Sequence, residues 1–139
     1  MNMKNIYKVL RYAMSFIFLW AFVDKTFGLG YATVRGKAWI NDVSPTTGFL
    51  LHGTGGPFAE FFQSLANHAV VDWLFMLALL GIGLGLLLRR YVKWGAVVGM
   101  VLMLLMYLAT FPPVNNPIID DHIIYILVLA VLAIESRRA

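Results

Sequence analysis

Four apolar segments of 18 or 19 residues constrain the fold of this chain more than any other feature. They are residues 12–29, 70–88, 94–111 and 117–134. A helix of about 20 residues matches the hydrocarbon thickness of a bilayer. The chain is 60% hydrophobic and only 13% charged, which is too apolar for an ordinary soluble domain. We therefore expect a single membrane domain over residues 1–139, an all-α integral membrane protein folded as a four-transmembrane-helix bundle.

Charged residues are distributed unevenly about these segments. Eight basic residues and one acid, Glu135, lie on the side of the two termini and give it a net charge of +7. The opposite side holds three basic and six acidic residues. Because Lys and Arg favour the cytoplasmic side, we expect a multi-pass protein of the cytoplasmic membrane with both termini cytoplasmic. A cleaved signal peptide ending near residues 30–32 is the less favoured alternative.

The outer segment 31–67 is too long to be a structureless loop in a compact chain. Ser44-Pro45 and Gly56-Pro57 each have the pattern of an N-cap followed by proline at the first helical position. They predict short helices over residues 44–51 and 57–67. Both carry apolar side chains and neither can cross a bilayer, so we expect interfacial or re-entrant helices.

The outer segment also contains residues suited to an anion. Backbone amides of the glycine-rich link 52–56, beside a helix N-terminus, suit an oxyanion such as a sulfur oxyacid. A plain tight turn between two interfacial helices is the simpler and favoured explanation of these glycines. The basic residues of this segment either guide an anion or hold phospholipid head groups. The predicted substrate-binding residues are Arg35, Lys37, Thr46, Thr47, His52, Asn116 and Asp120.

Two predicted membrane helices become polar near their outer ends. The first ends its apolar run at Asp24-Lys25, and the fourth begins at Asn116-Pro117, predicted as N-cap and first helical residue, and continues through Asp120, Asp121 and His122. An ionisable group at the bilayer centre costs about 3 kcal/mol, and less near the interface, so such groups favour a functional interpretation. We expect the first and fourth helices to line a common outward-facing site. Ion pairing, either within Asp24-Lys25 or from Lys25 to an aspartate of the fourth helix, is the structural alternative.

Proton transfer is the chemistry that these residues suggest. Reducing a quinone consumes two protons with two electrons, and carboxylates and imidazoles at the membrane edge can carry them. The predicted catalytic residues are Asp24, Lys25, Asp121 and His122, supported by Asp72, His68 and Tyr125. Segments 70–88 and 94–111 are interpreted as scaffold, with glycines at small-xxx-small spacing.

Other chemistry is disfavoured by the sequence. The chain contains no cysteine, so it supplies no disulfide, thiolate or cysteine-held cluster of its own. No spacing typical of metal ligands is present, and no pair of histidines lies deep on facing helices. We expect no metal, no covalent cofactor and no nucleic-acid partner.

Three motifs in one order resemble the DoxX family, especially its DoxD branch, the small membrane subunit of thiosulfate:quinone oxidoreductase. They are Phe18 to Lys25, Ser44-Pro45-Thr46-Thr47-Gly48, and Asn116-Pro117 with Asp120-Asp121-His122. The resemblance extends from about Arg11 to Ala133. It implies a four-helix membrane bundle that passes electrons from thiosulfate to a membrane quinone together with a second subunit.

These observations predict a membrane subunit of a quinone-linked oxidoreductase. It would bind an anionic reductant, thiosulfate or a related sulfur anion, at the outer segment and a diffusible quinone between the first and fourth helices. The alternative is a non-catalytic membrane module that binds a small solute or lipid or recruits a redox partner. The lipid bilayer and either a second subunit or a homo-oligomer are the expected partners, the latter through exposed glycine faces.

Overall fold

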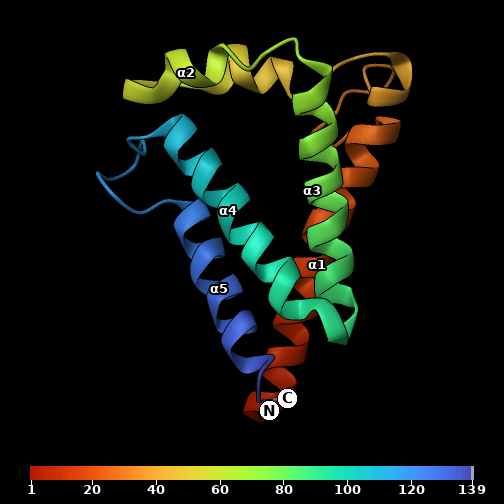
Figure 1. Ribbon diagram of the computed structural model, residues 1–139, viewed down its shortest axis with the longest axis vertical. Coiled ribbons are helices and arrows are strands. Elements are labelled where there is room, and N and C mark those ends of the chain that lie inside the picture. Colours follow the sequence, from red (N-terminus) through yellow and green to blue (C-terminus); the bar gives the residue numbers. More distant parts are fainter. Residues whose placement is uncertain (139) are drawn as a thin grey trace.

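The structure, a computed structural model, describes residues 1–138, and these residues form a helical protein with two diverging arms (Figure 1). The long helices are α1 (Met3–Phe27), α3 (Ala69–Leu87), α4 (Val92–Thr110) and α5 (Asp121–Glu135). The short ones are η1 (Trp39–Asn41), η2 (Phe49–Gly53), η3 (Gly56–Phe58), α2 (Ala59–Gln63) and η4 (Arg89–Tyr91). No strand occurs among the described residues, and 72% of them are helical, which confirms the all-α prediction.

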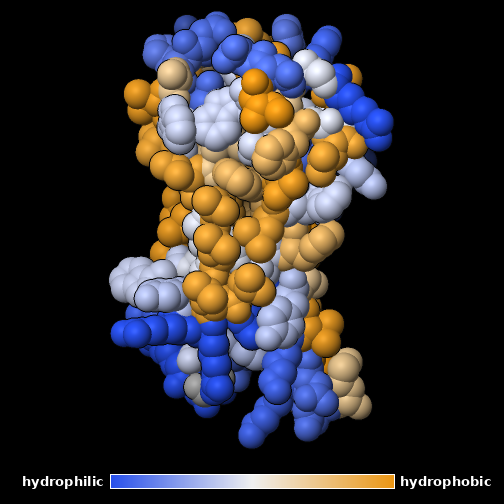
Figure 2. All heavy atoms as spheres, turned by 90° about the vertical axis from the view of Figure 1, so that its right-hand side faces the viewer, coloured by the Kyte–Doolittle hydropathy of each residue, from blue (hydrophilic) through white to orange (hydrophobic). Residues whose placement is uncertain are grey.

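Three helices are long and apolar enough to cross a membrane, namely α1, α3 and the stretch Arg89–Thr110 that contains α4. Their exposed surface is also apolar: Phe16 of α1 and Leu74 of α3 are 63% and 65% exposed. Figure 2 shows apolar side chains gathered in a middle band of one face, between hydrophilic groups at the two ends. Such a band matches a bilayer, and the chain is a multi-pass membrane protein.

The C-terminal helix is shorter than the sequence predicts. It begins at Asp121 and spans 15 residues, whereas the apolar segment predicted a helix from Pro117 to Ile134. The cause is Asn116, whose side-chain oxygen accepts hydrogen bonds from the backbone N–H groups of Ile118 at 2.9 Å and Ile119 at 2.6 Å. This local turn competes with helix formation, so the N-cap moves from Asn116 to Asp120.

The two arms are α1 packed along α3 and α5 packed along α4 (Figure 1). They meet near the end that carries both termini, called here the basic end, and separate toward the opposite end, called the roofed end. The hydroxyl of Ser15 in α1 donates to the Gly83 carbonyl of α3 at 2.7 Å. The core contains side chains from all four long helices, including Phe18, Ile82, Met103 and Leu129.

Glycines let α3 and α4 touch where the arms meet. A Cβ added to Gly85 would come within 2.9 Å of the Gly95 Cα, so the two backbones lie in direct contact. A Cβ on Gly99 would lie 2.9 Å from a methyl group of Leu129 in α5. These glycines are therefore used for packing inside the chain, and only Gly81 of the predicted small-residue pairs faces open space.

The outer segment forms several short helical pieces that lie across the roofed end (Figure 1). Ser44 acts as a cap, as predicted, because its hydroxyl oxygen accepts from the backbone N–H of Thr47 at 3.1 Å. The predicted helix 44–51 is formed in part, as a turn at residues 45–46 and a helical stretch over residues 47–53 that includes η2. The predicted helix 57–67 is divided into η3, α2 and a terminal turn. We call residues 44–67 the roof.

A single added methyl group tests the α3–α4 contact. We expect Gly85→Ala to destabilise the protein by about 1–3 kcal/mol, because backbone atoms must move to admit the Cβ. Gly81→Ala is the matched control on the same helix, since its Cβ would meet nothing within 4 Å. Thermal unfolding in detergent checks both variants, and equal midpoints would contradict the close contact.

Candidate functional site

A cavity of about 480 Å³ lies between the two arms beneath the roof, and we call it the roofed cavity. Its walls come from α3 and α4, and its ceiling comes from the roof. The α3 residues are Val71, Leu74, Phe75 and Ala78. The α4 residues are Val98, Val101, Leu102, Leu105, Met106 and Ala109. The roof residues are Pro45, Thr46, Phe49, Leu50, Phe62 and Leu65. The remaining lining residue is Lys25 of α1, so the cavity is almost wholly apolar.

Lys25 supplies the one basic group of the cavity lining. It lies in the last turn of α1 and is half-buried, and its ammonium nitrogen is 5.8 Å from the ring centre of Phe75. Among the described residues, no carboxylate oxygen lies within 4.0 Å of this nitrogen. The predicted ion pair of Lys25 with an aspartate is therefore not formed, and its N–H donors remain available to a ligand in the cavity.

Asp24, predicted as a catalytic residue, has a structural role in the loop that follows α1. It is 1% exposed, and its carboxylate accepts backbone N–H groups of Leu29 at 3.1 Å, Tyr31 at 3.4 Å and Thr33 at 2.9 Å. These bonds hold the chain that leaves α1. Adjacent helical residues point about 100° apart, so Asp24 faces this loop while Lys25 faces the cavity.

A polar network fixes the roof to α3. One carboxylate oxygen of Asp72 accepts hydrogen bonds from the hydroxyls of Ser44 and Thr46, both at 2.6 Å. The hydroxyl of Thr47 donates to the oxygen of Ser44 at 2.8 Å and accepts from the backbone N–H of Asn67 at 3.1 Å. Asp72, Thr46 and Thr47, which were predicted as site residues, thus form a structural latch that closes the cavity.

The roof is also fixed to the end of α4. The backbone N–H of Gly55 donates to the Ala109 carbonyl at 3.0 Å. Gly56 has a positive φ of 73°, and a Cβ there would overlap the Phe111 carbonyl oxygen at 1.8 Å. Only glycine suits this close approach. The glycine-rich link thus has a packing reason of its own, which is the simpler of the two explanations given by the sequence.

The polar residues of α5 lie on the other arm. Asp120 caps the helix by accepting the backbone N–H groups of His122 at 2.9 Å and Ile123 at 3.3 Å, and its second oxygen lies 2.8 Å from the His122 Nδ1. Asp121 is exposed in the first turn, and Tyr125 is half-buried against the core. Figure 1 shows the end of α1 and the start of α5 well separated, so the structure does not bring Asp24 and Lys25 together with these residues.

Hydrogen bonding affects the acidity of the cap. Burial raises the pKa of the Asp120 carboxyl, but the hydrogen bonds from the side chain of His122 and from the backbone of Ile123 outweigh burial. The pKa therefore lies below its ordinary value of 3.8. The carboxylate is the form that caps α5, and a negative charge at this position is favoured by the helix dipole.

The remaining predicted residues are spread over the surface of the roofed end. Arg35 and Lys37 are exposed in the loop between α1 and η1. His52 is exposed in η2, and His68 is exposed at the start of α3, with its Nδ1 3.2 Å from the Leu65 carbonyl oxygen. None of these side chains lines the roofed cavity. Within residues 1–138, no three His, Asp or Glu side chains are grouped as metal ligands would be.

The cavity walls are the residues that the sequence did not reveal. Segments 70–88 and 94–111 were interpreted as scaffold, yet α3 and α4 form most of the lining. No sequence pattern distinguished these wall residues, because Phe75 and Leu102 are of the same residue types that face lipid or the core elsewhere in the chain. Of the predicted site residues, only Lys25 and Thr46 line the cavity.

Comparisons with protein-family models, with curated proteins and with solved structures find no match to this chain. The site is therefore interpreted from its own geometry.

Removing the Asp72 carboxylate tests the latch. We expect Asp72→Ala to destabilise the protein by about 1–3 kcal/mol, because it leaves the Ser44 and Thr46 hydroxyls without their acceptor. Glu60→Ala is the control, since it removes an exposed acid of the roof that makes no side-chain hydrogen bond among the described residues. The two unfolding midpoints in detergent should differ clearly, and equal effects would exclude a latch.

The capping carboxylate predicts a pH dependence. The pKa of Asp120 is lower in the folded protein than in the unfolded chain, so its stabilisation is complete above the ordinary pKa and is lost as pH falls through the lowered value. Asp120→Ala should therefore cost about 1 kcal/mol at neutral pH and much less once the pH lies well below the ordinary pKa of 3.8. The free energy of unfolding of both proteins, measured from neutral to acidic pH, checks the direction of this change. A destabilisation by Asp120→Ala that grows on acidification would contradict the prediction.

Proposed function

We propose that this chain is the membrane subunit of a quinone-linked oxidoreductase and that the quinone head group binds in the roofed cavity. The observation that carries the proposal is an apolar cavity, about 480 Å³ in volume, with a single unpaired ammonium in its wall. This volume lies within the range of about 300–1,000 Å³ that is typical of small-molecule sites. A quinone has a planar apolar ring and two carbonyl acceptors, and it matches such a lining.

Access from the membrane supports a lipid-soluble ligand. Leu74 of α3 is 65% exposed, and Val101 and Leu105 of α4 are 55% and 45% exposed, although all three line the cavity. The cavity is therefore open on a side that faces lipid. A shallower groove continues along α3 and α4 toward the basic end, sharing Ala78 and Val98 with the cavity. It offers a path for an isoprenoid tail.

The proposed role of Lys25 is to hold the quinone and favour its reduction. A carbonyl oxygen would accept a hydrogen bond from the ammonium, while the quinone ring packs near Phe75. When electrons are added ahead of the two protons, negative charge develops on this oxygen, and a fixed cation in an apolar site stabilises it. The electrons come from an anionic reductant through a second subunit, for which thiosulfate or a related sulfur anion is the class that the DoxD resemblance favours.

We further propose that α5 is a fourth crossing, with the basic end in the cytoplasm. Both termini lie at that end (Figure 1), which supports an even number of crossings. Leu129 and Leu132 of α5 are fully buried, which supports α5 as an integral part of the bundle. The eight basic residues near the termini favour the cytoplasmic side. The roof would then rest at the outer interface as short interfacial or re-entrant helices.

A non-catalytic lipid-binding module is the second candidate. The long groove that continues from the cavity favours it, because an acyl chain fits there as well as an isoprenoid tail. The two candidates differ in the head group that Lys25 would select, a quinone carbonyl or a lipid phosphate.

Lys25→Met provides the central test, because it removes the charge while keeping the length of the side chain. We expect it to weaken binding of a short-chain quinone by about 10-fold to 100-fold, corresponding to about 1.5–3 kcal/mol for a hydrogen bond to a charged group. Lys37→Met is the matched control, since this lysine is exposed at the same end outside the cavity. Binding is measured by calorimetry in detergent, with a phospholipid as competitor.

A second variant separates cavity binding from surface binding. Ala78→Phe places a large side chain where the cavity and the groove meet, and it should abolish quinone binding without removing any charge. Unchanged binding in both Lys25→Met and Ala78→Phe would refute the quinone site. Absence of thiosulfate-dependent quinone reduction by the native complex would refute the oxidoreductase assignment and leave the lipid-binding module.

A further inference from the structure

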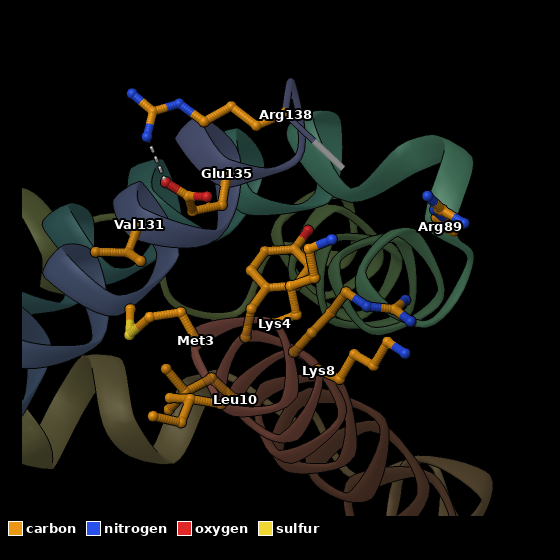
Figure 3. Close-up of a pocket in the computed structure, with 11 residues that line it drawn as sticks. Met3, Lys4, Lys8, Leu10, Arg89, Val131, Glu135 and Arg138 are labelled. Atoms are coloured by element: carbon orange, nitrogen blue, oxygen red, sulfur yellow. Dashed lines mark hydrogen bonds and ion pairs between the residues drawn. The ribbon is translucent and has the colours of Figure 1, made fainter. Parts of the chain in front are cut away.

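A second large groove lies at the basic end, between the start of α1 and the end of α5 (Figure 3). Its volume is about 490 Å³, and it is far along the bundle from the roofed cavity. We call it the basic groove. The proposed quinone chemistry makes no use of it.

One side of the basic groove is cationic. Lys4 and Lys8 extend from α1, and Arg89 extends from η4 (Figure 3); we call these three residues the groove cations. All three are exposed, and none has a carboxylate oxygen within 4.0 Å among the described residues. The one acid of the lining, Glu135, is already paired with Arg138 at 3.1 Å. The groove therefore has excess positive charge that no carboxylate within residues 1–138 neutralises.

The opposite side is apolar. Met3 and Leu10 of α1 and Val131 of α5 face the groove away from the groove cations (Figure 3), and we call them the apolar wall. Met3 is 76% exposed and Val131 is 48% exposed, so a broad apolar surface remains uncovered beside the charges. A ligand that satisfies both sides must carry an anionic group and a hydrocarbon portion.

The base of the groove is rigid. The guanidinium of Arg11 is buried and donates to the backbone carbonyls of Leu86 at 2.7 Å and Leu87 at 2.8 Å. These carbonyls belong to the last turn of α3, where a cation is favoured by the helix dipole. Arg11 thereby fixes α1 to α3 and adds a positive charge beneath the groove cations.

We propose that the basic groove binds an anionic phospholipid of the leaflet at this end, with the head-group phosphate on the groove cations and an acyl chain along the apolar wall. A phosphodiester is ionised at neutral pH and forms charge-assisted hydrogen bonds with Lys and Arg. Basic pockets between membrane helices at the polar interface are suited to such head groups. A free phosphate would leave the apolar wall uncovered. The lipid would bridge α1, η4 and α5, the elements that meet where the arms join.

The test uses the full chain in detergent with phosphatidylglycerol, phosphatidylcholine or inorganic phosphate, and native mass spectrometry counts the bound lipid. Lys4→Gln, Lys8→Gln and Arg89→Gln are combined in one variant. Arg90→Gln, Lys93→Gln and Arg137→Gln form the control, because they remove the same charge at the same end outside the groove lining. We expect the groove variant to lose phosphatidylglycerol affinity by roughly 100-fold, while the control loses less than about tenfold.

A third variant keeps the charges and fills the groove. Val131→Trp should also weaken phosphatidylglycerol binding, because it occupies the apolar wall. Selective loss in both groove variants, with unchanged unfolding midpoints, supports the proposal. Equal loss in the control variant, equal affinity for phosphatidylcholine, or displacement of the lipid by inorganic phosphate would overturn it.

Discussion

The direct backbone contact between α3 and α4 at Gly85 and Gly95 is the constraint on which the rest of the structure depends. Helix pairs usually stand about 8–10 Å apart because side chains separate them. Here the helices touch close to the short link η4, and they diverge as they run toward the roofed end (Figure 1). The space that opens between them is the roofed cavity. The roofed cavity is present because Gly85 and Gly95, which permit the contact, lie near one end of α3 and α4.

The polar residues of the roofed end mainly stabilise this open arrangement. Asp72 fixes the roof to α3, Gly56 brings it against the end of α4, and Asp24 holds the loop that leaves α1. Each carboxylate binds donors of the protein itself, which is the expected condition of a buried charge. Lys25 differs, because its ammonium faces a cavity and has no carboxylate beside it in the part of the chain that the structure describes. This difference, rather than the number of polar residues, is the reason for proposing a ligand site in the cavity.

Much of the fold could be predicted from the sequence, because hydrophobic length is a direct consequence of bilayer thickness. Helices α3 and α4 lie within two residues of the predicted segments, whereas α1 begins at Met3, nine residues before the predicted start. The capping hydrogen bond of Ser44 was also predicted. The start of α5 was not predicted, because the choice between an Asn116 cap and an Asn116 turn depends on a balance of local hydrogen bonds. The roofed cavity could not be predicted, because its walls are apolar residues whose orientation depends on how the helices cross. The predicted site residues were polar, and they serve different ends: Asp24 and Asp120 accept backbone N–H groups, whereas others, such as Arg35, are exposed at the surface.

The lipid-facing opening of the roofed cavity has a consequence for any molecule that uses it. Leu74, Val101 and Leu105 are exposed apolar residues of the cavity lining, so a lipid-soluble ligand would reach the proposed site by lateral diffusion in two dimensions. Occupancy then depends on the mole fraction of the ligand among the lipids, and the aqueous concentration matters only through partitioning. A longer hydrocarbon tail would raise occupancy without any new contact to the protein. Affinity measured in one detergent or membrane therefore transfers to another only after correction for the partition coefficient.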